Sequence, residues 1–199
     1  MDETVIHHAI QAVSKGGLIV YPTDTLYALG ASIADKDAVS RIFSVKKRPL
    51  SLPLPVAFSD EQMISDYVFL SSVGKRLVEH FLPGQLTLVC KKKEKIPSVV
   101  TAGKDTLAVR IPNDDIALTI IKKTGPLVVT SANIHGENPP LTVDEIRKVF
   151  KPGMVEVFVD DGPRSGDPST IVDVTTSQPK MLREGNVSFD EIMSVSDGV

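Results

Sequence analysis

The sequence predicts an α/β fold: a single domain with a twisted, mixed parallel and antiparallel sheet flanked by helices. Three observations support this prediction. Apolar patterns with helical spacing alternate with short β-rich runs along the chain. No internal repeat and no linker rich in Gly or Ser divides the 199 residues. The composition, 42% hydrophobic and 24% charged, is ordinary for a globular protein, so we expect one domain over residues 1–199.

The helices are predicted from apolar spacing and from capping signals. They cover residues 5–13, 35–45, 73–81, 142–150 and a short segment after 188. The first is expected to stop at Gly16 and Gly17, because glycine is favoured just past a helix end. Thr142 and Ser188 are each followed three residues later by glutamate, which is the spacing of a capping box.

The strands are predicted from short runs of apolar and β-branched residues, each bounded by Gly, Pro or polar residues. They cover residues 18–21, 86–90, 107–111, 127–130, 155–159 and 170–174. Because helices and strands interleave, the sequence favours an α/β arrangement over separate helical and strand regions.

Charge and apolar runs exclude two broad classes. The chain carries 22 Lys and Arg against 25 Asp and Glu, so it is not a polycation built to coat nucleic acid. Its apolar runs are far shorter than the roughly 20 residues of a membrane helix. The acidic start, Met1 to Glu3, is unlike a signal peptide. We therefore expect a cytoplasmic protein that does not enter a membrane.

The sequence signatures of several enzyme classes are missing. Cys90 is the only cysteine, which excludes an intrachain disulfide and a C-x-x-C zinc site. No string matches G-x-x-x-x-G-K-[ST], G-x-G-x-x-G, G-x-S-x-G or H-E-x-x-H. A Walker phosphate loop is thereby excluded, and dinucleotide binding, serine hydrolysis and zincin chemistry lose their usual support.

Polar residues follow the ends of several predicted strands, where α/β folds commonly bind ligands. Residues 23–25 hold two hydroxyls and a carboxylate, 130–133 read T-S-A-N, and 166–170 add further hydroxyls. Arg110 lies within a predicted strand, and such an arginine sits at an edge, in solvent or facing an anion. Together with Arg183, these groups describe an anion pocket rimmed by small donors.

Simpler interpretations stay open for the first of these segments and for the basic residues 46–48. Residues 22–25 could form a proline-initiated turn whose Thr and Asp side chains bond to their own backbone. The basic residues 46–48 follow a predicted helix, and cations are favourable near a helix C-terminus without any ligand. The residue types alone therefore do not decide whether these segments form a turn and a helix cap or bind a ligand.

The order of eight short motifs is more specific. P-T-D-T-L-Y-A-L-G, K-K-R-P, L-P-G-Q-L-T, V-T-A-G, A-V-R-I-P, T-S-A-N, S-T-I-V-D and L-R-E-G occur in this order from Pro22 to Gly185. The chain thus resembles the YrdC family of threonylcarbamoyl-AMP synthases over nearly its whole length. The resemblance implies a YrdC-like fold and the synthesis of threonylcarbamoyl-AMP and pyrophosphate from L-threonine, bicarbonate and ATP, for tRNA modification.

The resemblance also implies site residues, position by position. Those matching threonine-binding positions are Thr25, Arg110, Thr130 and Ser169. Those matching ATP-binding positions are Lys46, Arg48, Leu52, Thr106, Ser131, Ala132, Asn133 and Arg183. Lys46 and Arg48 are the expected phosphate-stabilising groups, with Mg²⁺ carried by ATP and no metal ligand from the protein. No general base is assigned, and Asp24 is a candidate only by proximity.

Three departures from the family pattern keep other functions open. Leu52 stands where a polar residue is common, Ala57 where histidine is frequent, and Pro140 near a position usually held by serine. A nucleotide-binding regulator without catalysis is therefore one alternative. Another is an RNA-binding module, since residues 91–95 hold four lysines, although a solvated turn explains them as well. A downstream threonylcarbamoyl transferase is the implied partner.

Overall fold

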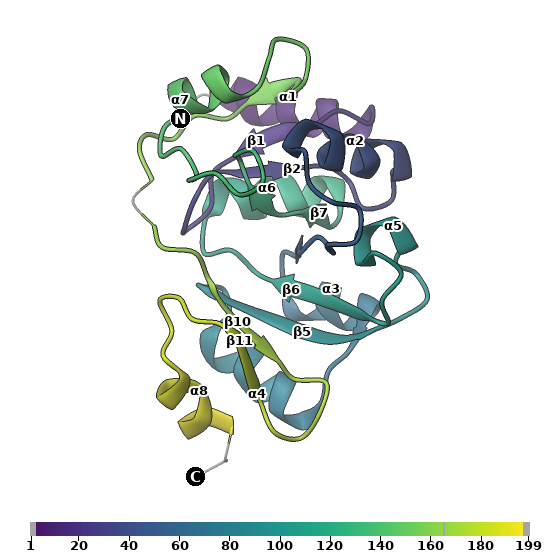
Figure 1. Ribbon diagram of the computed structural model, residues 1–199, viewed down its shortest axis with the longest axis vertical. Helices are drawn as coiled ribbons and strands as arrows, with labels where there is room; N and C mark the ends of the chain where they lie inside the picture. The colour runs from purple at the N-terminus through teal and green to yellow at the C-terminus, as the bar shows by residue number, and fades with distance from the viewer. Residues whose placement is uncertain (1–2, 165, 197–199) are drawn as a thin grey trace.

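A computed structural model describes residues 3–164 and 166–196. Within these residues the strands form two sheets (Figure 1). The smaller has the order β8-β2-β1-β9. Its strands are β1 (Ile19–Tyr21), β2 (Ala28–Gly30), β8 (Thr130–Ser131) and β9 (Val157–Phe158). β1 runs antiparallel to β2 and parallel to β9, so this sheet is mixed.

The larger sheet has the order β11-β10-β5-β6-β3-β7, with β4 paired to β5. Its strands are β3 (Val56–Ala57), β4 (Val68–Phe69), β5 (Leu86–Lys92), β6 (Thr106–Arg110), β7 (Leu127–Val128), β10 (Thr170–Asp173) and β11 (Lys180–Arg183). β10 is parallel to β5, whereas β6 is antiparallel to it. The predicted α/β class with mixed pairing is confirmed, but the strands divide between two sheets instead of forming one.

The predicted strand over residues 127–130 is where the two sheets separate. β7 pairs with β3 in the larger sheet, and β8 pairs with β2 in the smaller one. Between them the Val129 N–H donates to the Pro55 carbonyl at 2.9 Å. A single β-rich run therefore supplies two short strands, and the chain passes from one sheet to the other at Val129.

Helices cover both sheets. They are α1 (Glu3–Ser14), α2 (Lys36–Lys46), α3 (Glu61–Tyr67), α4 (Ser72–Phe81), α5 (Ser98–Thr101), α6 (Asp115–Thr124), α7 (Val143–Val149) and α8 (Phe189–Ser196). α1 packs on α6, and α4 packs on α8. In Figure 1 α1 and α7 lie at the top, whereas α4 and α8 lie with the larger sheet below. The predicted capping box between Thr142 and Glu145 is confirmed at the start of α7.

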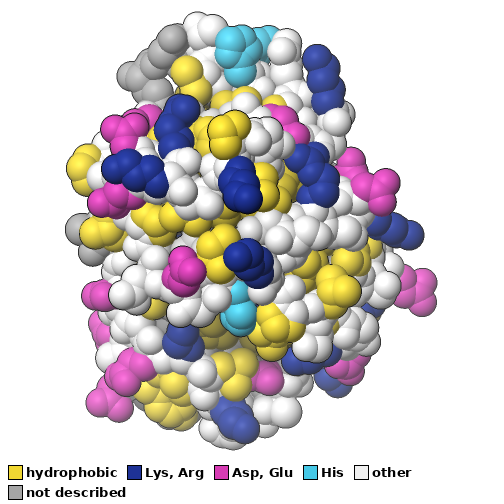
Figure 2. Space-filling model, turned by 45° about the horizontal axis from the view of Figure 1, so that its top comes forward, with side chains coloured by type: hydrophobic (Ala, Val, Ile, Leu, Met, Phe, Trp, Pro, Cys, Tyr) yellow, Lys and Arg dark blue, Asp and Glu magenta, His cyan; other side chains and the backbone are white. Residues whose placement is uncertain are grey.

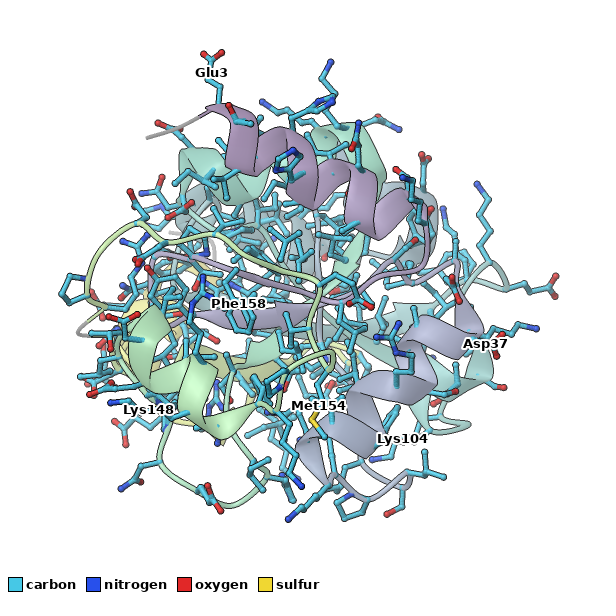
Figure 3. All side chains as sticks on the ribbon, turned by 90° about the horizontal axis from the view of Figure 1, so that it is seen from above. Glu3, Asp37, Lys104, Lys148, Met154 and Phe158 are labelled. Atoms are coloured by element: carbon cyan, nitrogen blue, oxygen red, sulfur yellow. The ribbon has the colours of Figure 1, made fainter. Side chains whose placement is uncertain are left out.

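The core consists of two clusters of buried apolar side chains. One fills the space around both sheets, and the other lies between α1, α6 and β1, with Ile19 and Ile120 among its members. Figure 3 shows charged side chains such as Glu3 and Asp37 pointing outward from their helices. Among the described residues, no helix combines the length and apolar character needed to cross a membrane.

Candidate active site

The loop between β1 and β2 is a tightly bonded turn. Thr23 Oγ1 donates to the Leu26 carbonyl at 2.6 Å and accepts from the Thr25 N–H at 3.3 Å. The Gln85 side chain donates to the Asp24 carbonyl at 2.9 Å, which joins this turn to the larger sheet. The turn interpretation is therefore correct for Thr23, while the Asp24 and Thr25 side chains point to a different partner.

That partner is Arg110, at the end of β6. Its Nη2 lies 2.6 Å from Asp24 Oδ1, and its Nη1 donates to Thr25 Oγ1 at 3.2 Å. Only 5% of Arg110 is exposed, so burial lowers its pKa while the Asp24 charge raises it. Because Arg110 belongs to the larger sheet and Asp24 to the loop of the smaller one, this buried ion pair joins the two sheets at the candidate site.

A second arginine lies close by and holds Ser169. Arg183 Nη2 donates to the Ser169 carbonyl at 2.7 Å, and Ser169 Oγ shares a 2.8 Å hydrogen bond with Thr87 Oγ1. Burial and then the Arg110 charge lower the pKa of Arg183, so the two guanidinium groups act on each other. Two neighbouring cations that repel each other favour an anion between them.

Arg183 was expected among the nucleotide residues. The structure places it beside Ser169, one of the expected threonine contacts. Thr25, Arg110 and Ser169 are thus buried, whereas Arg183 is exposed at the end of β11 but bonds to Ser169 and lies within the field of Arg110. Thr130 is buried in β8, and nothing in the hydrogen bonding described for it connects its side chain to this group.

Two glycines bring backbones together around this group. A Cβ on Gly166 would lie 2.1 Å from the Thr25 carbonyl oxygen. A Cβ on Gly185 would lie 2.2 Å from the Pro168 carbonyl oxygen and 2.7 Å from the Ser169 carbonyl carbon. Real side chains do not approach backbone so closely, and only glycine permits these contacts.

Gly185→Ala is expected to raise the KM for threonine about fivefold, because the backbone of Ser169 must move and one hydrogen bond is worth about 1 kcal/mol. Steady-state kinetics with varied threonine measures this. Gly17→Ala is the matched control, since its Cβ would lie 2.8 Å from the Ala12 carbonyl oxygen, away from the site. An equal change in KM for both variants would show that the Gly185 contact does not act through Ser169.

The T-S-A-N segment is held by Lys46, the last residue of α2. Lys46 Nζ donates to the Ser131 carbonyl at 2.5 Å, the Asn133 carbonyl at 2.7 Å and Asn133 Oδ1 at 3.1 Å. An ammonium group has three protons, and all three are used here. Only 1% of Lys46 is exposed. The geometry thus makes Lys46 an anchor of this segment, and a direct phosphate contact would require it to leave these oxygens.

Only some of the other residues expected to bind ATP lie near Lys46. Arg48 donates to the carbonyls of Leu52 at 3.3 Å and Pro53 at 2.9 Å, and burial lowers its pKa. The Ala132 N–H donates to the Tyr27 carbonyl at 2.9 Å. Thr106 starts β6, about 13 Å from Arg110 at the strand rise of about 3.3 Å per residue.

The departure at Ala57 falls beside the candidate site. Ala57 is buried in β3 and pairs in register with Arg110, and the Phe58 N–H donates to the Arg110 carbonyl at 2.9 Å. A methyl group therefore occupies the place beside Arg110 where the family often carries an imidazole. The Arg110 backbone pairs with β3 on one side, and the preceding residue Val109 pairs with Leu88 of β5 on the other.

A polar cavity of about 380 Å³ lies at the loop that carries Thr25. Its lining residues are Thr23, Asp24, Thr25, Gln85, Pro163, Arg164, Gly166, Asp167 and Asn186. This volume lies within the usual range for small-ligand sites. Of the expected threonine contacts, Thr25 alone lines it, whereas Arg110 reaches it through Asp24.

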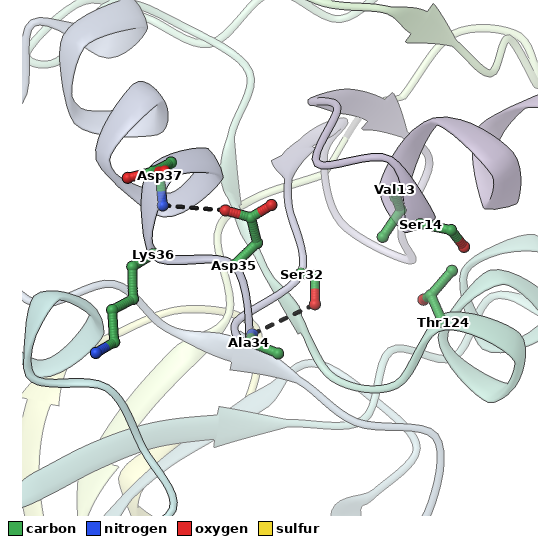
Figure 4. A pocket seen from close by; sticks show the side chains of 8 residues that line it. All are labelled: Val13, Ser14, Ser32, Ala34, Asp35, Lys36, Asp37 and Thr124. Atoms are coloured by element: carbon green, nitrogen blue, oxygen red, sulfur yellow. Dashed lines mark hydrogen bonds between the residues drawn. The ribbon is translucent and has the colours of Figure 1, made fainter.

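A larger hollow of about 580 Å³ lies elsewhere, between the end of α1, the start of α2 and the end of α6 (Figure 4). It contains none of the expected site residues. Its carboxylate Asp35 accepts from the Asp37 and Ala38 N–H groups and so caps α2. The position of Asp35 is thus explained by helix capping, and we assign the hollow no ligand.

Three side chains at the candidate site were not expected from the sequence. Gln85 lines the cavity and Thr87 bonds to Ser169, and both belong to the L-P-G-Q-L-T motif, which carried no assigned role. Arg164 lies 5.6 Å from the centre of the Tyr27 ring and pairs with Asp114 and Asp161.

Within the described residues, no group of three or more His, Cys, Asp or Glu side chains could hold a metal ion.

Comparison with known proteins identifies the family. The Sua5/YciO/YrdC family model, described as "Telomere recombination", matches residues 11–185, so the chain belongs to this family. It is 37% identical to threonylcarbamoyl-AMP synthase of Pyrococcus abyssi, covering 98% of this chain and 58% of that protein. A putative threonylcarbamoyl-AMP synthase of Methanocaldococcus jannaschii is 34% identical, covering 94% of this chain and 89% of that protein.

Solved structures agree with this assignment. Pyrococcus abyssi Sua5 complexed with L-threonine superposes with a TM-score of 0.93 at 35% identity, over 98% of this chain and 58% of that one. Escherichia coli YciO superposes with a TM-score of 0.88 at 30% identity, over 96% and 94%. The resemblance to the YrdC family and the fold it implied are thus confirmed. The chain spans a little over half the length of the Pyrococcus abyssi relative.

Proposed function

We propose that this chain is an L-threonylcarbamoyladenylate synthase, and hence a nucleotidyltransferase. The observation that carries the proposal is the buried cluster of Arg110, Asp24 and Thr25 between the two sheets, with Arg183 and Ser169 beside it. It supplies cationic and hydroxyl groups for an amino acid. The Pyrococcus abyssi relative is named threonylcarbamoyl-AMP synthase and the Methanocaldococcus jannaschii relative a putative one, and Pyrococcus abyssi Sua5 has been crystallised with L-threonine.

The proposed reaction has two bond-forming stages. The threonine ammonium group first loses a proton to solvent, and the free amine adds to bicarbonate, which forms a carbamate and releases water. A carbamate oxygen then attacks the α-phosphorus of ATP, and pyrophosphate leaves with the electron pair of the broken P–O bond. Such transfers depend chiefly on holding reactants together and stabilising phosphate charge.

The residues have separate tasks in this scheme. Arg110 would bind the threonine carboxylate through its guanidinium group, the fork that matches a carboxylate. Arg48 is the expected phosphate contact, while Lys46 holds the Ser131 to Asn133 backbone that lines the nucleotide. Mg²⁺ would enter with ATP and neutralise phosphate charge. Bicarbonate, Mg²⁺, a downstream transferase and a cytoplasmic location stay predictions of the resemblance and the sequence.

Direct RNA binding is not favoured. Lys93 donates to the Ser65 carbonyl at 2.5 Å and stacks over Phe69, and Lys95 lies over Tyr67, so two of the four lysines in residues 91–95 have partners in the protein. On the face shown in Figure 2, Lys and Arg side chains are spread among hydrophobic and uncharged ones. We therefore expect the product to pass to a separate tRNA-modifying enzyme.

Pyrophosphate release tests the proposal. Purified protein with ATP, Mg²⁺ and bicarbonate should release pyrophosphate when L-threonine is present, and at a rate lower by about tenfold or more with L-serine, which lacks one methyl group. Omission of bicarbonate should also reduce the release. Intact ATP binding without threonine-dependent release would instead support the nucleotide-binding regulator and contradict the synthase.

A further inference from the structure

An amino-acid substrate carries a carboxylate and an ammonium group on one carbon atom, and a buried site must provide a partner of opposite charge for each. This reasoning rests on the proposed function, in which L-threonine is the substrate. Arg110 is the proposed partner of the carboxylate. The positively charged amine requires an acceptor, and an ammonium group without one would lose much of its solvation free energy on entering the site.

The acceptor is suggested by the ion pair itself. The Arg110 and Asp24 side chains are 6% and 9% exposed, and their Nη2 and Oδ1 atoms lie 2.6 Å apart. Yet Arg110 Nε and Asp24 Oδ2 are buried and have no hydrogen-bond partner among the described residues. Buried polar atoms are nearly always paired, so a donor and an acceptor left over in one ion pair indicate a ligand that supplies both partners.

The position of Asp24 fits this task. Asp24 lines the 380 Å³ cavity together with the hydroxyl residues Thr23 and Thr25. Gln85 holds its backbone carbonyl, and Arg110 Nη2 also contacts the Gly84 carbonyl at 3.3 Å, so the pair is fixed before a substrate enters. The last torsion of an aspartate is broad, so Oδ2 can turn toward the cavity while Oδ1 keeps Arg110.

We propose that Asp24 binds the α-ammonium group of the amino-acid substrate, so that Arg110 and Asp24 together recognise it as a zwitterion. Asp24 is then a specificity residue, which admits amino acids and discriminates against acids that lack the amine. Thr25 Oγ1 accepts a hydrogen bond from Arg110 Nη1 and so helps to hold the guanidinium group in place.

The test compares two ligands by calorimetry, L-threonine and the dihydroxy acid in which a hydroxyl replaces its amine. The wild-type protein should bind L-threonine about 10- to 100-fold more tightly, as expected for one charge-assisted hydrogen bond. In Asp24→Asn this ratio should fall to about threefold or less. A purely structural role of Asp24 would weaken or strengthen both ligands together and leave the ratio unchanged, which would overturn the proposal.

Two control variants sharpen the comparison. Asp114→Asn weakens the ion pair with Arg164, and the Asp114 side chain is also 9% exposed, but it does not line the cavity. Asp167→Asn neutralises an exposed carboxylate that does line it. Both should keep the wild-type ratio. A loss of the ratio in Asp167→Asn with a normal ratio in Asp24→Asn would assign the ammonium to Asp167 and overturn the proposal.

The pyrophosphate assay separates this inference from the function on which it rests. Threonine-dependent pyrophosphate release with an unchanged ligand ratio in Asp24→Asn would overturn the role of Asp24 alone. Threonine binding with the expected ratios, but no pyrophosphate release, would support Asp24 and contradict the synthase. A wild-type protein that binds neither ligand would overturn both.

Discussion

Arg110→Ala is expected to raise the KM for threonine by about 10- to 100-fold, because a charge-assisted hydrogen bond to a carboxylate is worth about 1.5–3 kcal/mol. The same change leaves the Asp24 carboxylate buried without its cation. Breaking a buried ion pair on one side costs about 3–5 kcal/mol of the free energy of unfolding. Steady-state kinetics and urea denaturation measure the two effects separately.

Two further variants separate binding from folding. Arg110→Ala combined with Asp24→Asn removes both charges, so it should recover part of the lost stability while threonine binding stays weak. Arg41→Ala is the control, since Arg41 forms an exposed ion pair with Glu156. A normal KM for threonine in Arg110→Ala would remove Arg110 from the substrate site.

Lys46→Met is expected to abolish a strong pH dependence of stability. Burial and then the Arg48 charge lower the pKa of Lys46 to about 7, against 10.5 for an ordinary lysine. Between these values the unfolded chain holds a proton that the folded chain has released. Stability should therefore rise from pH 7 toward pH 10 in the wild-type protein relative to Lys46→Met, by up to about 1.4 kcal/mol per pH unit.

Below pH 7 the amine is protonated in both states, and the cost of burying the charge is present in full. Urea denaturation of both proteins from pH 6 to pH 10 gives the difference directly. Lys47→Met provides the control, because Lys47 is the exposed neighbour of Lys46. Parallel pH profiles for wild type and Lys46→Met would mean that the three oxygens around Nζ keep Lys46 charged.

The parts of the fold with strong local signals were predicted from the sequence. α1, α2, α4 and α7 follow the apolar spacing and caps, and β5, β6 and β10 follow the β-rich runs. The division into two sheets was not predicted, because it depends on which distant strands pair with residues on either side of Val129. The two-residue strands β3 and β4 are too short for a periodic pattern.

Several residues of the candidate site could be named from the sequence, but the contacts between them could not. Motifs identified Thr25, Arg110 and Ser169, and the structure brings these together through Asp24 and Arg183. The anchor role of Lys46 was not predictable, since a lysine at the end of a helix is usually exposed to solvent. Its burial follows from the approach of residues 131–133, which are far from it in the sequence.

A crystal structure with L-threonine and a non-hydrolysable ATP analogue tests the central claim most directly. We expect the threonine carboxylate within hydrogen-bond distance of the Arg110 guanidinium, near Ser169, and the phosphates on the side of Arg48. Threonine bound elsewhere, with the Arg110–Asp24 pair touching no ligand atom, would contradict the account.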